Sequence, residues 1–153
     1  MGNSAGAIHT ATWLLESKFA ESRKSVTSGS LSLQGAILVS IPAHFKITDA
    51  SRADILTAYY GDEIEENCAF GVLKRAKDPK VRTLVVTGSL DPEDEICQPS
   101  DEFVERWQSQ FGESGLSVQQ LEGHNHFSTV MALGTGIEKE ETLGATVLEW
   151  IGK

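Results

Sequence analysis

The chain has 153 residues, of which 40% are hydrophobic and 23% charged, and its formal net charge at pH 7 is −9. This length and composition are typical of one globular domain that buries its own core. The acidic balance argues against nucleic-acid binding, which needs clustered lysine and arginine. We find no apolar run of membrane-spanning length and no signal peptide. We therefore predict a cytoplasmic protein with no membrane span, whose two cysteines, Cys68 and Cys97, are free thiols.

A serine between small residues stands at the start of the chain, in the stretch Gly2-Asn3-Ser4-Ala5-Gly6. This is the G-x-S-x-G pattern, in which the serine lies on a strained turn between a strand and a helix. Larger side chains at either glycine are expected to clash with the neighbouring strand and helix. We expect a helix from about Ala5 to Glu21, whose first N–H groups face the turn. We expect no strand before the turn, because only three residues precede Ser4.

Strand and helix patterns alternate along the rest of the chain. Leu33 to Ile41 is a continuous apolar run, which is typical of a parallel sheet covered by helices on both faces. This alternation predicts an α/β fold, with a parallel sheet of about three strands flanked by helices. The other expected elements are a serine-rich loop at Ser22–Ser32, a helix at Ala50–Tyr60 capped by Asp49, an acidic helix at Glu63–Lys77, a strand at Val81–Thr87, a helix from Pro99 to Gly112, a strand at Leu116–Leu121 and a helix at Glu138–Ile151.

Three kinds of reactive side chain follow successive strand ends. Ser4 lies at the turn, Asp91 follows the strand at Val81–Thr87, and His124 and His126 follow the strand at Leu116–Leu121. The carboxyl ends of parallel strands meet at one edge of a sheet, so these side chains are expected to converge. A serine needs a histidine to take its proton, and the histidine needs a carboxylate to orient it. The order of the residues therefore predicts a serine hydrolase.

At this point the sequence resembles the C-terminal half of an α/β-hydrolase. The resemblance is to esterases and lipases related to hormone-sensitive lipase, to feruloyl esterases and to kynurenine formamidases. It rests on four segments that span nearly the whole chain: Gly2-Asn3-Ser4-Ala5-Gly6-Ala7, Tyr59-Tyr60-Gly61, Gly88-Ser89-Leu90-Asp91-Pro92 and Gly123-His124-Asn125-His126-Phe127.

The resemblance implies a triad of Ser4, Asp91 and His126, with the N–H of Ala5 in the oxyanion hole. It implies a small ester or amide substrate and no cofactor. Asp94 is the alternative acid, although Pro92 favours Asp91 by holding it extended at the end of its strand. The alternative base is His124.

A metal site is the competing interpretation of the His-x-His spacing. Two histidines need a third and usually a fourth ligand to hold zinc. Neither His44 nor the two cysteines lie at a ligand spacing, so we predict no metal. For His44, a surface loop position is favoured over a place in a substrate pocket.

The strands before the turn and the glycine-rich oxyanion loop of such hydrolases have no counterpart in the sequence. We therefore expect residues 1–153 to be the C-terminal portion of a single α/β-hydrolase domain, starting at the serine turn. The alternative function is an inactive hydrolase remnant that acts as a binding module. Without a preceding strand, Ala36 to Val39 would be an exposed edge, through which the chain could self-associate.

Overall fold

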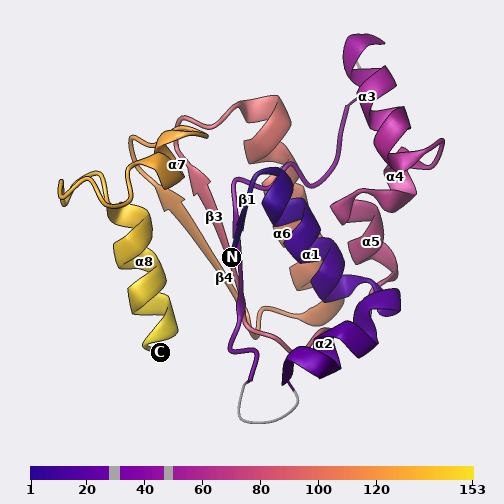
Figure 1. Cartoon of the computed structure of the whole chain (residues 1–153), viewed down its shortest axis with the longest axis horizontal. Helices are drawn as coiled ribbons and strands as arrows, with labels where there is room; N and C mark the ends of the chain where they lie inside the picture. Colours follow the sequence, from indigo (N-terminus) through magenta and orange to yellow (C-terminus); the bar gives the residue numbers. More distant parts are fainter. Residues whose placement is uncertain (28–31, 47–49) are drawn as a thin grey trace.

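The computed structural model of the chain describes residues 1–27, 32–46 and 50–153. Four parallel strands form one sheet in the order β1-β2-β3-β4 (Figure 1). The strands are β1 (Gly2–Asn3), β2 (Ala36–Val39), β3 (Thr83–Gly88) and β4 (Leu116–Leu121). The helices are α1 (Ala5–Leu15), α2 (Ala20–Thr27), α3 (Ala50–Tyr60), α4 (Ile64–Asn67), α5 (Ala69–Arg75), α6 (Gln98–Phe111), α7 (Ser128–Met131) and α8 (Thr142–Ile151), with a 3-10 turn η1 (Ser17–Phe19) and a π-helical turn η2 (Glu93–Cys97).

The predicted α/β architecture is confirmed, with one strand more than expected. Gly2 pairs with Leu38 and Asn3 with Val39, so a two-residue strand does precede Ser4 and that expectation was wrong. All four residues of β2 are buried. The expected exposed edge at Ala36 to Val39 is therefore absent, and the edges of the described sheet are β1 and β4.

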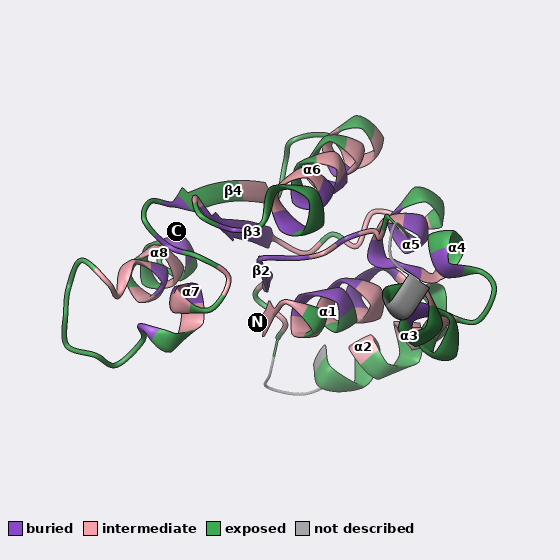
Figure 2. Cartoon of the chain, turned by 90° about the horizontal axis from the view of Figure 1, so that it is seen from above, coloured by how far each residue is buried: buried purple, intermediate pink, exposed green. Residues whose placement is uncertain are grey.

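Alternate residues of the inner strands build a core on each face of the sheet. Leu38 and Val85 pack with α1, α5 and α6 on one face. Val39 and Val86 point the other way and pack with Leu143 and Trp150 of α8. Figure 2 shows buried residues gathered along the sheet and on the helix surfaces that contact it. Two-sided burial explains why these strands are apolar at successive positions.

The expected helix from Ala5 to Glu21 ends at Leu15, because the backbone of Glu16 is extended. Arg23 occupies this end of the helix by donating to the carbonyl oxygens of Trp13 and Glu16. Its own segment is helix α2, so the expected loop at Ser22–Ser32 is wrong as far as Thr27. Positions 28–31, like the expected cap Asp49, lie outside the described residues.

Two further helix boundaries differ from the prediction. The stretch Glu63–Lys77 is interrupted at Cys68, whose sulfur accepts the N–H of Gly71 and so caps α5. The last helix begins at Thr142, four residues later than expected, because residues 138–140 form a turn. No helix in the described residues is long and apolar enough to cross a membrane.

Candidate active site

Ser4 lies on a sharp turn between β1 and α1. Its φ of 52° and ψ of −120° are strained for a residue with a side chain. The neighbouring strand β2 holds this conformation, because the Ser4 N–H donates to the Val39 carbonyl at 2.9 Å. A Cβ on Gly2 would lie 2.1 Å from the Gly6 carbonyl oxygen, so helix α1 requires glycine at position 2. The expected clash is wrong for Gly6, where a Cβ would meet nothing within 4 Å.

His126 lies against this serine. Its Nε2 atom is 2.9 Å from the Ser4 Oγ, a hydrogen-bonding distance. A turn built on Asn125 presents the histidine: the Asn125 Oδ1 accepts the N–H groups of Phe127 and Ser128, both at 3.0 Å. These bonds also satisfy the first donors of α7, so the short helix and the histidine are held by the same side chain.

Asp91 lies behind His126, with a side chain that has no exposed surface. One of its oxygens, Oδ2, accepts the Ser40 hydroxyl at 2.7 Å and the Gly88 N–H at 2.9 Å. The other, Oδ1, faces the His126 Nδ1 at 3.9 Å. Both facing atoms are buried and lack a hydrogen-bond partner among the described residues. The carboxylate is therefore held on one side and directed at the imidazole on the other.

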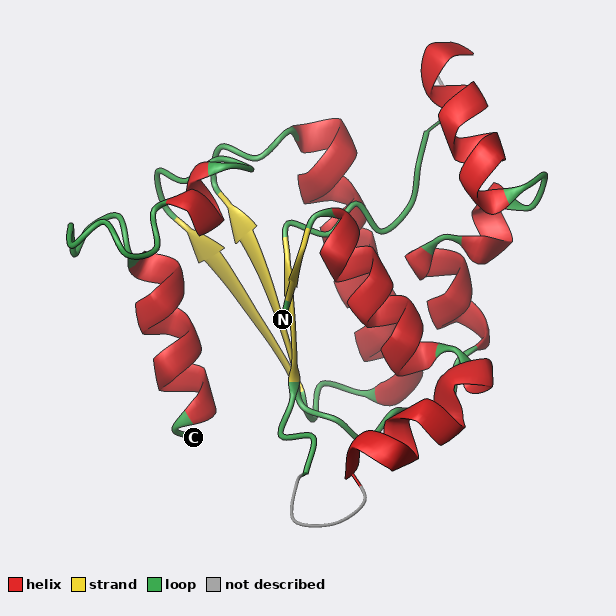
Figure 3. Cartoon of the chain, viewed as in Figure 1, coloured by secondary structure: helices red, strands yellow, loops and turns green. Residues whose placement is uncertain are grey.

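The loops that carry Asp91 and His126 are bonded to each other. The Leu90 N–H donates to the His124 carbonyl and the Gly123 N–H donates to the Ser89 Oγ, both at 2.8 Å. The arrowheads of β3 and β4 in Figure 3 mark the carboxyl edge from which both loops emerge. Their mutual position is thus fixed by the two adjacent strands.

The two alternative residues lie in other environments. Asp94 is exposed on η2. His124 is buried and its Nε2 lies 2.9 Å from the Thr142 hydroxyl, so it connects β4 to α8 and does not contact Ser4. The structure therefore brings Ser4, His126 and Asp91 together and leaves Asp94 and His124 outside this group.

A cavity of about 520 Å³ opens beside Ser4 and His126. Arg52 of α3 and Glu95 of η2 form a bidentate ion pair at the wall of this cavity. The hydrogen bond from Arg52 lowers the pKa of the Glu95 carboxyl. His44 also lines the cavity, and its Nε2 lies 2.9 Å from a Glu102 carboxylate oxygen. The expected surface loop position is therefore not the one observed, because the ring is half-buried. The other residues that line this cavity are Pro42, Phe45, Lys46, Asp94 and Ile96.

Ala5 is the first residue of α1, so its N–H has no acceptor within the helix. Ala5 directly follows Ser4 in the chain, which is the position of one oxyanion donor in G-x-S-x-G turns. Within the described residues, no group of three or more histidine, cysteine, aspartate or glutamate side chains could hold a metal ion.

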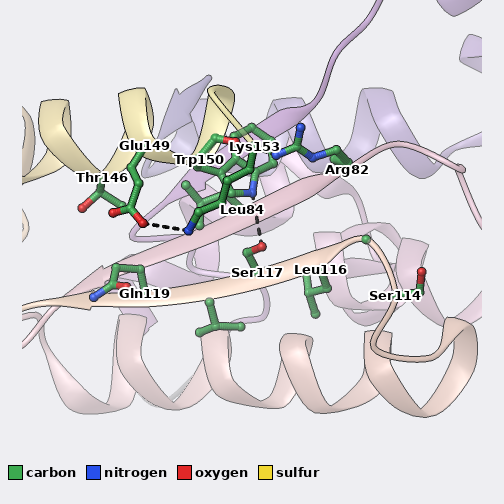
Figure 4. A pocket seen from close by; sticks show the side chains of 12 residues that line it. Arg82, Leu84, Ser114, Leu116, Ser117, Gln119, Thr146, Glu149, Trp150 and Lys153 are labelled. Atoms are coloured by element: carbon green, nitrogen blue, oxygen red, sulfur yellow. Dashed lines mark hydrogen bonds and ion pairs between the residues drawn. The ribbon is translucent and has the colours of Figure 1, made fainter.

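Figure 4 shows a second cavity, of about 630 Å³, between β4 and α8. It is lined by Arg82 and Leu116, which lie at the amino-terminal ends of β3 and β4, away from the edge that carries Ser4. Its polar groups bond to one another: Trp150 Nε1 donates to Ser117 Oγ at 3.2 Å, and Lys153 pairs with Glu149 at 2.7 Å. This cavity contributes no residue to the candidate site.

Two solved structures are similar to the chain as a whole. A carboxylesterase, Cest-2923 from Lactobacillus plantarum, aligns with 99% of the chain at a TM-score of 0.63 and 16% identity. A protein assigned as dipeptidyl aminopeptidase IV from Bacteroides ovatus aligns with 99% at a TM-score of 0.60 and 11% identity. The fold is that of the α/β hydrolases. The chain spans 56% of the length of the esterase and 18% of the peptidase. No protein-family model and no curated protein matches the sequence.

Sequence reasoning missed Ser40, which bonds to Asp91 from the end of β2. The available signal was its position: a single hydroxyl directly after an apolar strand, at the same sheet edge as the other site residues. A polar side chain there needs a buried partner.

Proposed function

We propose that the chain is a serine hydrolase of carboxylic esters or related acyl bonds, with Ser4 as nucleophile, His126 as general base and Asp91 as the acid that orients it. The observation that carries the proposal is the 2.9 Å contact between Ser4 Oγ and His126 Nε2 at a strained strand–helix turn. A serine in ordinary surroundings is a poor nucleophile, and this contact supplies the base that it needs.

The reaction proceeds in two steps. The Ser4 oxygen attacks the acyl carbon as His126 takes the hydroxyl proton, and the carbonyl oxygen becomes an oxyanion beside the Ala5 N–H. His126 then gives this proton to the leaving alcohol or amine, which departs and leaves an acyl-serine. Water then attacks the acyl-serine in the same way, with His126 taking a proton from the water. The carboxylic acid is released, and His126 returns the proton to Ser4. Asp91 keeps its charge throughout and stabilises the imidazolium.

We further propose that residues 1–153 form the C-terminal portion of a longer hydrolase domain. The 56% coverage of the esterase supports this proposal. In hydrolases of this fold a second oxyanion donor comes from a loop upstream of the nucleophile. The chain itself supplies the Ala5 N–H, and the loss of one donor typically lowers the rate by about 10²–10³.

The cavity beside Ser4 favours small acyl substrates. Among the described residues, charged groups from Lys46, Arg52 and Glu95 line it together with three apolar side chains. A long fatty acyl chain needs a mainly apolar wall along its length. We therefore expect short or polar acyl groups, and no cofactor takes part in the mechanism.

Hydrolysis of short-chain p-nitrophenyl esters by the purified chain tests the proposal. We expect slow turnover that Ser4→Ala abolishes. Equal rates for the two proteins, or none from either, would favour the alternative, an inactive remnant that acts as a binding module.

We also propose that the chain self-associates through a sheet edge. β4 is an edge strand of six residues without a charged side chain, and Val118 at its middle is 51% exposed. Sedimentation velocity tests this: Val118→Lys should reduce association at a given concentration. A monodisperse monomer would exclude it.

A further inference from the structure

Ser40 is a buried hydroxyl at the point where β2 ends. It has no exposed surface, and neither do its neighbours Val39 and Ile41. A hydroxyl in such a position loses its water and must bond within the protein. Its Oγ donates to Asp91 Oδ2 at 2.7 Å, across 51 positions of the chain. This is a charge-assisted bond, the stronger kind.

The backbone at Ser40 is strained. Its φ is 48°, in the left-handed region where glycine has no steric cost and serine has one. Only two other non-glycine residues among those described have a positive φ, namely Ser4 and Lys80. Lys80 lies in an exposed turn closed by Asp78, whereas Ser4 and Ser40 both belong to the candidate site. A serine where the backbone favours glycine indicates that the hydroxyl is needed.

The hydroxyl determines which oxygen of Asp91 is available to the histidine. Ser40 and the Gly88 N–H both bind Oδ2, and they come from the ends of two adjacent strands. Within the described part of the chain Oδ1 has no hydrogen-bond donor, and it faces His126 Nδ1. With Oδ2 held by two donors, the carboxylate plane cannot turn freely, so Oδ1 remains directed at the imidazole.

We infer that Ser40 is a positioning residue, which acts through Asp91 to orient His126. The inference rests on the proposed function, because an oriented histidine matters for catalysis only if Ser4 is the nucleophile. Ser40 is not among the residues that line the cavity, and its side-chain hydrogen bond goes to Asp91. We therefore expect its effect on the reaction to pass through the carboxylate.

Ser40→Gly is the sharpest test, because it removes the hydroxyl and relieves the strained φ, and so should leave a folded protein. Ser100→Ala is the matched control: Ser100 is equally buried, and its hydroxyl donates to the Ile41 carbonyl at 2.9 Å rather than to Asp91. The first readout is the NMR signals of the His126 ring, which need no substrate. The protein has four histidines, so the His126 signals can be assigned by their loss in His126→Asn.

We expect Ser40→Gly to shift or broaden the His126 ring signals and Ser100→Ala to leave them in place. Unchanged signals in folded Ser40→Gly would overturn the inference, whether or not the chain hydrolyses esters. If Ser40→Gly fails to fold, Ser40→Ala takes its place under the same criterion.

The second readout is kcat and KM for a p-nitrophenyl ester. Ser40→Gly should lower kcat roughly tenfold, the size of one lost charge-assisted hydrogen bond, with little change in KM. In an Asp91→Asn background the same substitution should cause no further fall, since the residue acts through Asp91. An additive fall would contradict the inference. If the wild-type chain has no activity, the proposed function fails, and the ring signals still decide the role of Ser40.

Discussion

The Oγ of Ser4 and the Nε2 of His126 lie 2.9 Å apart although 122 positions separate the two residues in the chain. Ser4 follows β1 and His126 follows β4, which are the two edges of the sheet. The contact forms because both residues leave their strands at the carboxyl edge, and the loops after β3 and β4 are bonded to each other. It therefore depends on the assembled sheet rather than on any local motif.

Substitution of the two candidate acids should separate their roles. Asp91→Asn keeps the shape of the side chain but removes the charge that faces His126, and we expect ester hydrolysis to fall by about 10³–10⁴. Asp94→Asn should lower kcat by less than about twofold although Asp94 lines the cavity, because Asp94 is exposed on η2 and the carboxylate that faces His126 is Asp91. Steady-state kinetics of the two variants measure this. A larger loss from Asp94→Asn would assign the acid to the other residue.

Substitution of His124 should mainly lower stability, whereas substitution of His126 should mainly lower activity. His124 is 4% exposed and bonds to Thr142, so His124→Ala should lower the free energy of unfolding by about 1–3 kcal/mol. Activity per folded molecule should stay within a few-fold. His126→Ala should abolish hydrolysis with little loss of stability. Urea unfolding combined with kinetics checks both, and loss of catalysis in fully folded His124→Ala would contradict the assignment.

The two glycines of the G-x-S-x-G motif form a matched pair. Gly2→Ala places a Cβ 2.1 Å from a backbone oxygen of α1 and should destabilise the fold by about 1–3 kcal/mol. Gly6→Ala meets nothing within 4 Å and lies inside a helix, so it should be neutral or stabilise by up to about 1 kcal/mol. Melting temperatures of the two variants measure the difference. Equal destabilisation would show that the turn is packed differently.

The cysteines should react with a thiol reagent at different rates. Burial raises the pKa of Cys68, which is 2% exposed, and it raises the pKa of the less buried Cys97 as well. Cys97 should therefore react first, and Cys97→Ser should remove the fast phase. Since the folded state holds the Cys68 proton more tightly than the unfolded state, this thiol stabilises the fold below its unfolded pKa of about 8.5, and that contribution is lost at higher pH. Faster modification of Cys68 would contradict its burial.

Much of the fold could be predicted because apolar periodicity reports burial directly. β3 and β4 lie where their patterns placed them, within two residues. Helix ends were harder to predict, because the groups that stop these helices lie outside the usual capping patterns. Arg23 reaches the end of α1 from the following helix, and the residue that caps α5 is a cysteine, Cys68.

The candidate site, like the fold, could be predicted only in part. Ser4, Asp91 and His126 could be proposed because each follows a recognisable strand or turn. Ser40 was missed, because its position after an apolar strand indicates a buried hydroxyl but does not identify Asp91, which the fold brings to within 2.7 Å of it, as the partner. The resemblance favoured His126 over His124, but the role of His124 needed the position of α8, which holds its partner Thr142.

The most direct test of the account is covalent labelling of the purified chain with a fluorophosphonate, followed by peptide mapping. The probe reacts with a serine only when a base has activated it. We predict that Ser4 is the labelled residue, that Ser4→Ala abolishes the label, and that His126→Ala lowers the labelling rate by at least about 10³ while His124→Ala does not. Labelling that is absent in folded wild-type protein, or unchanged in His126→Ala, would contradict the claim that Ser4 and His126 form a catalytic pair.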